Sequence, residues 1–269
     1  MPPHLHSCPA QKLALLLLFA LLLNACGASA GKLSPTQTAQ VERSRALATQ
    51  MAQSLQATYQ VESAQSTATA QAFQSLFESA RNWPLVSLHD FEQPSSDWLL
   101  GEQDNDYGAS NLEVQDGQYQ WKVKSLQGLV WWSVPDIATV SDFYAAVQCQ
   151  QIEGPEDGQL GLIFRKDPDD QYYIFQIDQQ GQFSIYLRYA EEWHTLWSWS
   201  PSSAISLQEP NRLAVMAQAD QFYFFVNNQL VAGLQDNRLP EGEIGLLVGL
   251  PQAAQSGQWV FDNFEVRAP

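Results

Sequence analysis

The sequence predicts an all-β domain, an antiparallel two-sheet sandwich, preceded by a signal peptide and a mainly helical stalk. Three observations lead to this prediction. All nine tryptophans occur from Trp83 onward. In the same part of the chain, apolar and polar residues alternate with period two, and Gly, Asp, Asn and Pro separate the alternating runs. About a dozen short runs at this spacing are typical of two packed antiparallel sheets.

The first element is a leader, which we assign to residues 1–25. Lys12 precedes an apolar run of 11 residues, 13–23. A membrane-spanning helix needs about 20 apolar residues, so the run predicts the core of a signal peptide. The following Leu23-Asn24-Ala25-Cys26 resembles a bacterial lipobox, and this resemblance implies cleavage after residue 25 and diacylglycerol on Cys26. The alternative is an ordinary secretory leader.

The lipobox-like sequence predicts where in the cell the protein is found. Two or three acyl chains hold a protein firmly on a membrane, whereas one chain binds reversibly. We therefore expect a secreted protein that is lipid-anchored through Cys26 at the cell membrane or cell surface.

The second element, residues 26–82, is rich in Ala, Gln, Thr and Ser, and carries few charges. Ser34-Pro35 is typical of a helix start, and glycine is absent from 35–82. A semi-flexible helical stalk is the favoured interpretation. A weak coiled coil that oligomerises the protein and a disordered segment are the alternatives. Phe73, Leu76 and Phe77 are expected to dock onto the following domain.

The third element is the sandwich, residues 83–269. Asp116-Gly117, Gln179-Gln180-Gly181 and Asn227-Asn228 each separate two alternating runs and predict hairpin turns. The predicted strands are 86–91, 111–115, 118–124, 127–133, 142–151, 158–166, 171–178, 182–189, 194–199, 211–218, 221–227, 230–235, 243–249 and 258–266.

The order of motifs resembles the concanavalin A-like lectin/glucanase jelly roll. The resemblance rests on Gly161-Leu162-Ile163-Phe164-Arg165, Tyr172-Tyr173-Ile174-Phe175, Asn227-Asn228, Gly242-Glu243-Ile244-Gly245 and Phe261-Asp262-Asn263-Phe264. Within that superfamily the chain is similar to the domain of 3-keto-disaccharide hydrolases and to laminin G-like modules. The resemblance covers about residues 86–267 and implies a jelly-roll fold. The matching residues are mostly core and turn positions, so they say little about activity.

Alternation places one set of polar and aromatic residues together on a single face of neighbouring strands. Sugars present apolar ring faces and many hydroxyls, so such a face is a candidate carbohydrate-binding surface. The alternative is a solvated outer face with ordinary cross-strand pairs. The candidate residues are Arg165, Tyr172, Gln176, Tyr186 and Arg188, with Asp178 on the same face.

Several tryptophans are further candidates. Trp131 and Trp132 are adjacent in a strand and must point to opposite faces. Trp193, Trp197 and Trp199 have the same parity, which predicts one shared face, and each is more typical of a core than of an exposed platform.

The sequence supports a catalytic function less strongly than it supports carbohydrate binding. Glycoside hydrolysis needs two carboxylates facing one cleft, and a glucanase of this fold carries a Glu-x-Asp-x-x-Glu or similar motif, which the sequence lacks. His89 and His194 form no metal or triad pattern, so no catalytic residue is predicted.

The net charge of the third element and its single cysteine limit the partners and the chemistry that we expect. Residues 83–269 hold 26 acidic and 8 basic residues, a difference of −18. So negative a domain repels nucleic acid. Cys149 is expected to be a buried, unreactive thiol. We expect no cofactor apart from a structural Ca²⁺, for which the turn 104–108 and Asp262 are weak candidates.

These observations favour a cell-surface lipoprotein whose sandwich binds a glycan or another extracellular ligand without catalysis. A glycoside-processing enzyme and a purely structural or interaction module are the alternatives.

Overall fold

The computed structural model describes residues 49–51, 53 and 75–269. The chain forms two compact units, 1–69 and 70–269. Residues 49–51 and 53 of the first unit are helical and exposed. The predicted signal peptide, Cys26, Phe73 and most of the predicted stalk lie outside the described residues. In the described part of the chain, no helix is long and apolar enough to span a membrane.

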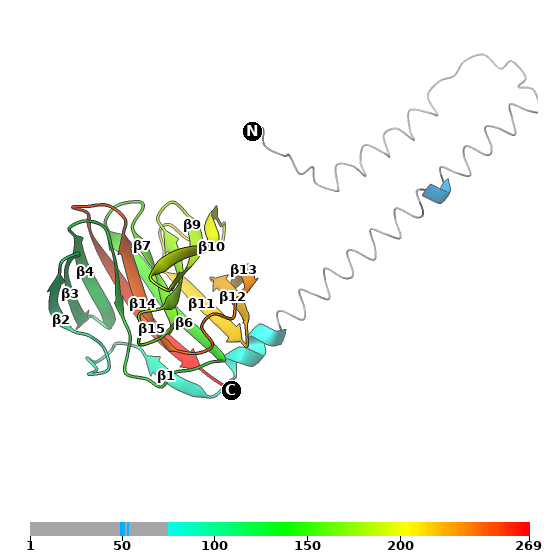
Figure 1. The fold of residues 1–269 in the computed structure, drawn as a ribbon, viewed down its shortest axis with the longest axis horizontal. Helices are drawn as coiled ribbons and strands as arrows, with labels where there is room; N and C mark the ends of the chain where they lie inside the picture. The colour runs from blue at the N-terminus through cyan, green and yellow to red at the C-terminus, as the bar shows by residue number, and fades with distance from the viewer. Residues whose placement is uncertain (1–48, 52, 54–74) are drawn as a thin grey trace, which may run out of the picture. The chain divides into compact units, whose positions relative to one another are not determined.

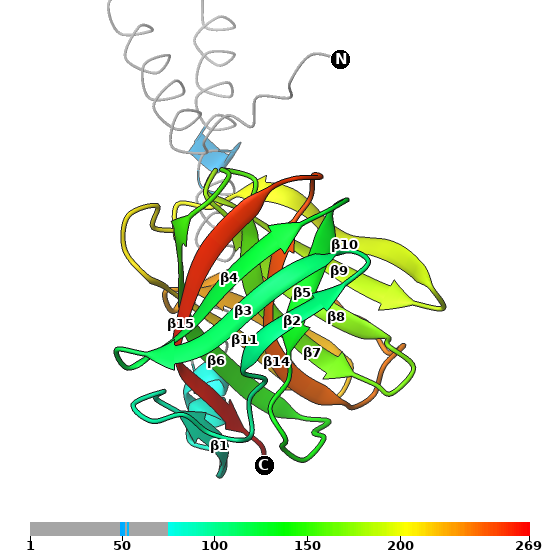
Figure 2. The same ribbon diagram turned by 90° about the vertical axis from the view of Figure 1, so that its left-hand side faces the viewer.

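The second unit contains two antiparallel sheets, which lie as two layers in Figures 1 and 2. Sheet A has nine strands within the described residues, in the order β13-β12-β11-β6-β15-β4-β3-β2, with β1 paired to β15. Its strands are β1 (Leu85–His89), β2 (Gly101–Asn105), β3 (Gly108–Gln115), β4 (Gln118–Ser125), β6 (Phe143–Glu153), β11 (Asn211–Gln218), β12 (Gln221–Val226), β13 (Gln229–Gln235) and β15 (Ser256–Arg267).

Sheet B has six strands among the described residues, in the order β10-β9-β8-β7-β14-β5. They are β5 (Leu129–Ser133), β7 (Gln159–Lys166), β8 (Tyr172–Asp178), β9 (Gln182–Tyr189), β10 (Glu192–Pro201) and β14 (Glu243–Leu250). The crossovers between distant strands make the sandwich a jelly roll, as predicted.

The core lies between the sheets because alternate residues of each strand point inward. Trp121 and Trp259 of sheet A and Tyr173, Phe175 and Phe164 of sheet B are fully buried there. Cys149 belongs to the same core and is a free, buried thiol. Because burial disfavours the thiolate, the pKa of Cys149 is raised far above its ordinary value.

The predicted hairpin turns are confirmed. Asp116 and Gly117 both have positive φ, and so do Asn227 and Asn228, which is the backbone of a two-residue turn between twisted strands. Gly181 also has positive φ, between β8 and β9. Strand β2 was not predicted, because its Glu-Gln-Asp-Asn sequence lacks apolar alternation and it lies at the edge of sheet A.

A short helix, 75–81, covers part of the outer face of sheet A (Figure 1). Phe77 is 3% exposed, and its ring centre lies 4.1 Å from that of Phe225 and 5.7 Å from that of Tyr144. Ala146 and Ala214, which have small side chains, belong to the same buried cluster as Phe77. The expected docking of Leu76 and Phe77 is therefore confirmed, and the folded unit begins before Trp83.

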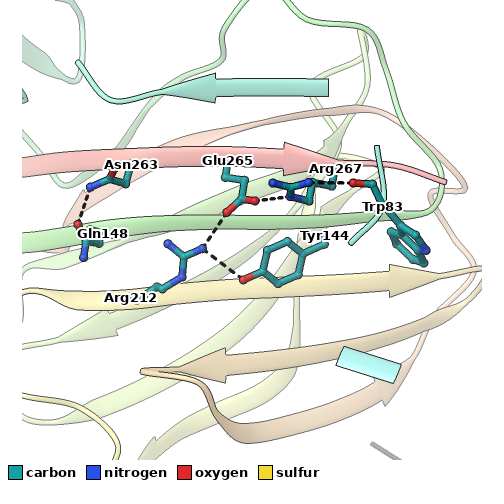
Figure 3. A network of polar contacts seen from close by, with 7 residues as sticks. All are labelled: Trp83, Tyr144, Gln148, Arg212, Asn263, Glu265 and Arg267. Carbon is teal, nitrogen blue, oxygen red and sulfur yellow. Dashed lines mark hydrogen bonds and ion pairs between the residues drawn. The ribbon is translucent and has the colours of Figure 1, made fainter. Parts of the chain in front are cut away.

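An ion network next to the helix joins three strands of sheet A (Figure 3). Arg212 of β11 donates to Glu265 of β15 at 2.9 Å and to the hydroxyl of Tyr144 at 3.4 Å. Arg267 also pairs with Glu265 and donates to the carbonyl of Trp83 at 3.0 Å. Although burial opposes ionisation, the bonds from Arg267 and Arg212 lower the pKa of Glu265. The network thus fixes the segment that leaves the helix to the last strand.

Candidate functional site

The outer face of sheet B brings together four of the five predicted ligand-binding residues. Tyr172 on β8 lies directly opposite Arg188 on β9, and Arg188 lies opposite Trp193 on β10. Tyr186 is opposite Ile174 in the next row. Residues directly opposite each other in an antiparallel pair point to the same face. We call Tyr172, Tyr186, Arg188 and Trp193 the Trp193 cluster.

Trp193 is the exposed platform of this cluster, at 47% exposure. Two tyrosine rings lie against it in T-shaped geometry. The ring centres of Tyr172 and Trp193 are 5.9 Å apart at 76°, and those of Tyr186 and Trp193 are 6.5 Å apart at 89°. The guanidinium carbon of Arg188 lies 5.8 Å from the centre of the Trp193 ring. The two tyrosine rings therefore hold one indole toward solvent, with the Arg188 cation beside it.

The other aromatic residues of the cluster are less exposed. Tyr172 is 4% exposed, and burial raises its pKa to about 12, with Asp170 adding to the rise and Arg188 opposing it. The hydroxyl therefore stays neutral at physiological pH and can act as a donor or an acceptor. Arg188 also donates to the carbonyl of Glu191 at 3.1 Å, which limits its movement.

Gln176 lies on the same face, opposite Ser184. It is 3% exposed, and its amide nitrogen donates to the Ser184 hydroxyl at 3.1 Å. Its Oε1 is buried and has no hydrogen-bond partner in the described part of the chain. A buried acceptor without a partner costs about 1–3 kcal/mol.

Arg165 is the exception, and its predicted place on this face is wrong. Its φ of 48° lies in the left-handed region, so the alternation of β7 breaks there. The side chain is 1% exposed and donates to the carbonyls of Leu239, Ser141 and Ala219 at 2.8, 2.8 and 2.6 Å. It also lies 4.7 Å above the core residue Phe222. Arg165 thus joins loops inside the sandwich, and burial lowers its pKa.

The prediction that Trp193, Trp197 and Trp199 share one face is also wrong. The register between β9 and β10 shifts between Thr195 and Trp197, and again before Ser200. Trp197 consequently packs against the core, where it stacks on Phe183 with ring centres 6.0 Å apart. Only a strand partner could reveal these irregularities, because an alternating sequence gives no sign of them.

The other half of the face is apolar and covered. Ile163, Ile174 and Leu247 are buried there, with Trp132 packed against them. Trp131 points into the core instead, so the two adjacent tryptophans do face opposite ways. The Lys166 ammonium lies 4.8 Å from the centre of the Trp132 ring, a contact that sequence reasoning missed. The exposed chemistry of sheet B is therefore at the β8–β10 end.

Asp178 has a structural contact at the end of β8. One of its oxygens accepts hydrogen bonds from the backbone amides of Gln180 and Gln182 at 3.0 and 2.9 Å, which closes the β8–β9 turn. Burial raises its pKa, and these amides oppose the rise. Among the outward side chains of β8 and β9, it is the one carboxylate.

Sheet A offers a different kind of surface. A hollow of about 430 Å³ is lined by Lys122, Glu153, Ser256, Gln258 and their neighbours on β4, β6 and β15. Lys122 pairs with Glu113, and Gln258 donates to Glu153. It is the larger of two described hollows, yet its lining contains no aromatic ring. We therefore place the candidate site at the Trp193 cluster.

The two weak calcium candidates have other contacts. In the β2–β3 turn, Asn105 accepts hydrogen bonds from the amides of Tyr107 and Gly108. Asp262 accepts one from the amide of Asn263, and burial raises its pKa. Within residues 49–51, 53 and 75–269, no group of three His, Cys, Asp or Glu side chains is arranged to hold a metal ion.

No protein-family model matches the chain, and no curated protein is significantly similar to it in sequence. Solved structures are similar in fold. A Bacillus subtilis protein of unknown function with a galectin-like fold has 14% identity and a TM-score of 0.51, over 68% of this chain and 95% of that one. A β-glucanase from Bacillus licheniformis has 9% identity and a TM-score of 0.50, over 68% and 98%.

A third similar structure is an endo-β-galactosidase from Clostridium perfringens that releases GlcNAcα1-4Gal. It has 12% identity and a TM-score of 0.50, over 70% of this chain and 63% of that one. At such identities the similarity concerns the fold alone. The domain is therefore a jelly-roll sandwich of the kind seen in galectin-like and glucanase structures.

Proposed function

We propose that the Trp193 cluster and Gln176 form a carbohydrate-binding surface and that the domain binds a glycan without cleaving it. The exposed indole of Trp193, held in T-shaped contact with two tyrosine rings, carries the proposal. A sugar ring can lie on such an indole with its apolar face, while Arg188 and the tyrosine hydroxyls reach its hydroxyl groups.

The fold supports a carbohydrate as the first ligand class to test. Two of the similar structures are a β-glucanase and an endo-β-galactosidase. Cleavage would require two carboxylates that face one cleft. Asp178, the outward carboxylate of β8 and β9, is instead engaged by two backbone amides. Because the sequence also lacks the Glu-x-Asp-x-x-Glu motif of glucanases with this fold, we favour binding over the glycoside-processing alternative.

The test is a glycan array followed by calorimetry on the Trp193→Ala variant. Loss of one stacked ring removes about 1–1.5 kcal/mol, which is about a tenfold loss of affinity. Tyr107→Ala is the matched control, because Tyr107 is 57% exposed in the distant β2–β3 turn. Wild-type protein that binds no glycan, or a Trp193→Ala variant with unchanged affinity, would refute the proposal.

We also propose that the mature protein begins at a lipidated Cys26 and acts at a cell surface. The lipobox-like Leu23-Asn24-Ala25-Cys26 and the short apolar leader support this proposal. Mass spectrometry of the mature N-terminus from the native host tests it. The expected result is a diacylglyceryl group on Cys26, and an unmodified cysteine would overturn it.

A further inference from the structure

Two acidic loops lie side by side next to the Trp193 cluster. One loop, 167–171, joins β7 to β8, and the other, 190–191, joins β9 to β10. Gln171 connects them. Its amide groups donate to the two oxygens of Asp167 at 2.9 and 2.8 Å, and its own oxygen accepts from the amide of Ala190 at 3.0 Å. The row Tyr172, Arg188 and Trp193 follows directly from these loops.

The exposed charge of these loops is negative. Asp169, Asp170, Glu191 and Glu192 are all exposed. Within the described residues, Asp170 is in an ion pair with Lys166, and the other three belong to none of the ion pairs found. Glu192 lies opposite Tyr189, which packs against the core, so its side chain points away from Trp193. Asp169 and Glu191 are therefore the two carboxylates at the rim of the cluster that belong to none of these ion pairs.

The nearby bases are engaged by the protein itself. The Lys166 ammonium lies 3.9 Å from Asp170 and against the Trp132 ring. Arg188 lies over the ring of Trp193 and donates to a carbonyl. Arg238, on the adjoining segment after β13, is paired with Asp236. An approaching ligand therefore meets an aromatic platform surrounded by uncompensated carboxylates.

We infer that the glycan bound at this site carries free, protonated amino groups, so that the ligand class is amino sugars and uronic acids are disfavoured. This inference rests on the proposed function. The indole of Trp193 supplies a stacking face that also attracts cations, as its contact with Arg188 shows. Glu191 and Asp169 would pair with ammonium groups and repel carboxylate groups.

The first experiment compares a glucosamine hexamer with its fully N-acetylated form, which has the same backbone but no charge. An exposed ion pair contributes a factor of about two to five, so two pairs predict about tenfold tighter binding of the free amine. The preference should be seen at about 10 mM salt and disappear at about 1 M, because the screening length falls from about 30 Å to about 3 Å.

The glycan array separates failure of this inference from failure of the proposed function. If no glycan binds, the proposed function fails and the inference fails with it. If neutral glycans or uronates bind and amine-bearing glycans bind no tighter, the proposed function stands and the inference alone is overturned. The expected result is that the strongest array signals belong to glycans with free amino groups.

A charge-neutralising variant tests the rim directly. Asp169→Asn with Glu191→Gln should reduce the amine preference from about tenfold to about twofold and leave binding of the acetylated hexamer unchanged. The matched control is Glu102→Gln with Asp104→Asn, which removes the same charge from the exposed strand β2. A preference that persists in the rim variant, or that falls equally in the control, would refute the role of the rim.

Discussion

Replacement of Phe77 by alanine tests whether the helix 75–81 is an integral part of the sandwich. Phe77 is 3% exposed and packs on Phe225 and Tyr144, which are themselves 5% and 0% exposed. A phenylalanine removed from a closed core costs about 3–5 kcal/mol. Phe77 packs on the surface of a sheet, where the helix can shift inward to fill the space. We therefore expect a loss at the lower end of this range, about 3 kcal/mol of unfolding free energy.

Urea denaturation of the mature chain measures this loss directly. For a folded unit of 150–250 residues, each kcal/mol shifts the melting temperature by about 2–4 °C, so the expected decrease is about 6–12 °C. Hydrogen exchange should also accelerate in residues 75–83, because their amides depend on the docked helix.

Ser79→Ala is the matched control on the same helix. Ser79 is exposed, and such a surface substitution changes stability by about 0.5 kcal/mol or less. If Phe77→Ala and Ser79→Ala unfold at the same urea concentration, the helix contributes nothing to the domain and the packing argument is refuted.

Three further predictions concern the sandwich itself. Arg165→Met leaves three loop carbonyls without a donor and should lower the unfolding free energy by about 3 kcal/mol or more, measured in urea; a change within about 0.5 kcal/mol would contradict this role. The pKa of Glu265 is lower in the folded state than its ordinary 4.5, so its ion network stabilises the fold above that pH and loses this contribution as the pH falls through the lowered pKa. Glu265→Gln should therefore remove this part of the pH dependence of the unfolding free energy. An unchanged acid-unfolding profile in the variant would show that the network adds no stability. Ala190 has a φ of 50° in the β9–β10 turn, so Ala190→Gly should raise the melting temperature by relieving about 1 kcal/mol of left-handed strain, partly offset by backbone entropy, and a lower melting temperature would contradict it.

Most of the sheet architecture could be predicted from local pattern. The period of two along 172–178 and 182–189 placed Tyr172, Gln176, Tyr186 and Arg188 on one face, and the pairing of β8 with β9 confirms it. The pattern was sufficient because side chains of a regular strand alternate by stereochemistry alone. Where the strand is irregular, as at Arg165, the same rule predicted the wrong face.

Contacts between segments far apart in the sequence could not be predicted from apolar alternation. Arg212 and Glu265 meet because β11 and β15 both border β6. Gln171 brings two acidic loops together although Asp167 and Ala190 belong to different connections. The rim of the candidate site is therefore a product of strand order, which hydrophobic alternation does not encode.

The sequence by itself determined the all-β class, the hairpin turns and the shared face of four candidate residues. These depend on the geometry of single strands and two-residue turns, in which each residue is constrained mainly by its neighbours in the chain. The tertiary structure alone decided that Trp193 is exposed while Trp197 is in the core, and that Arg165 points inward. A bulge moves every following side chain to the other face, and whether a bulge forms depends on the partner strand.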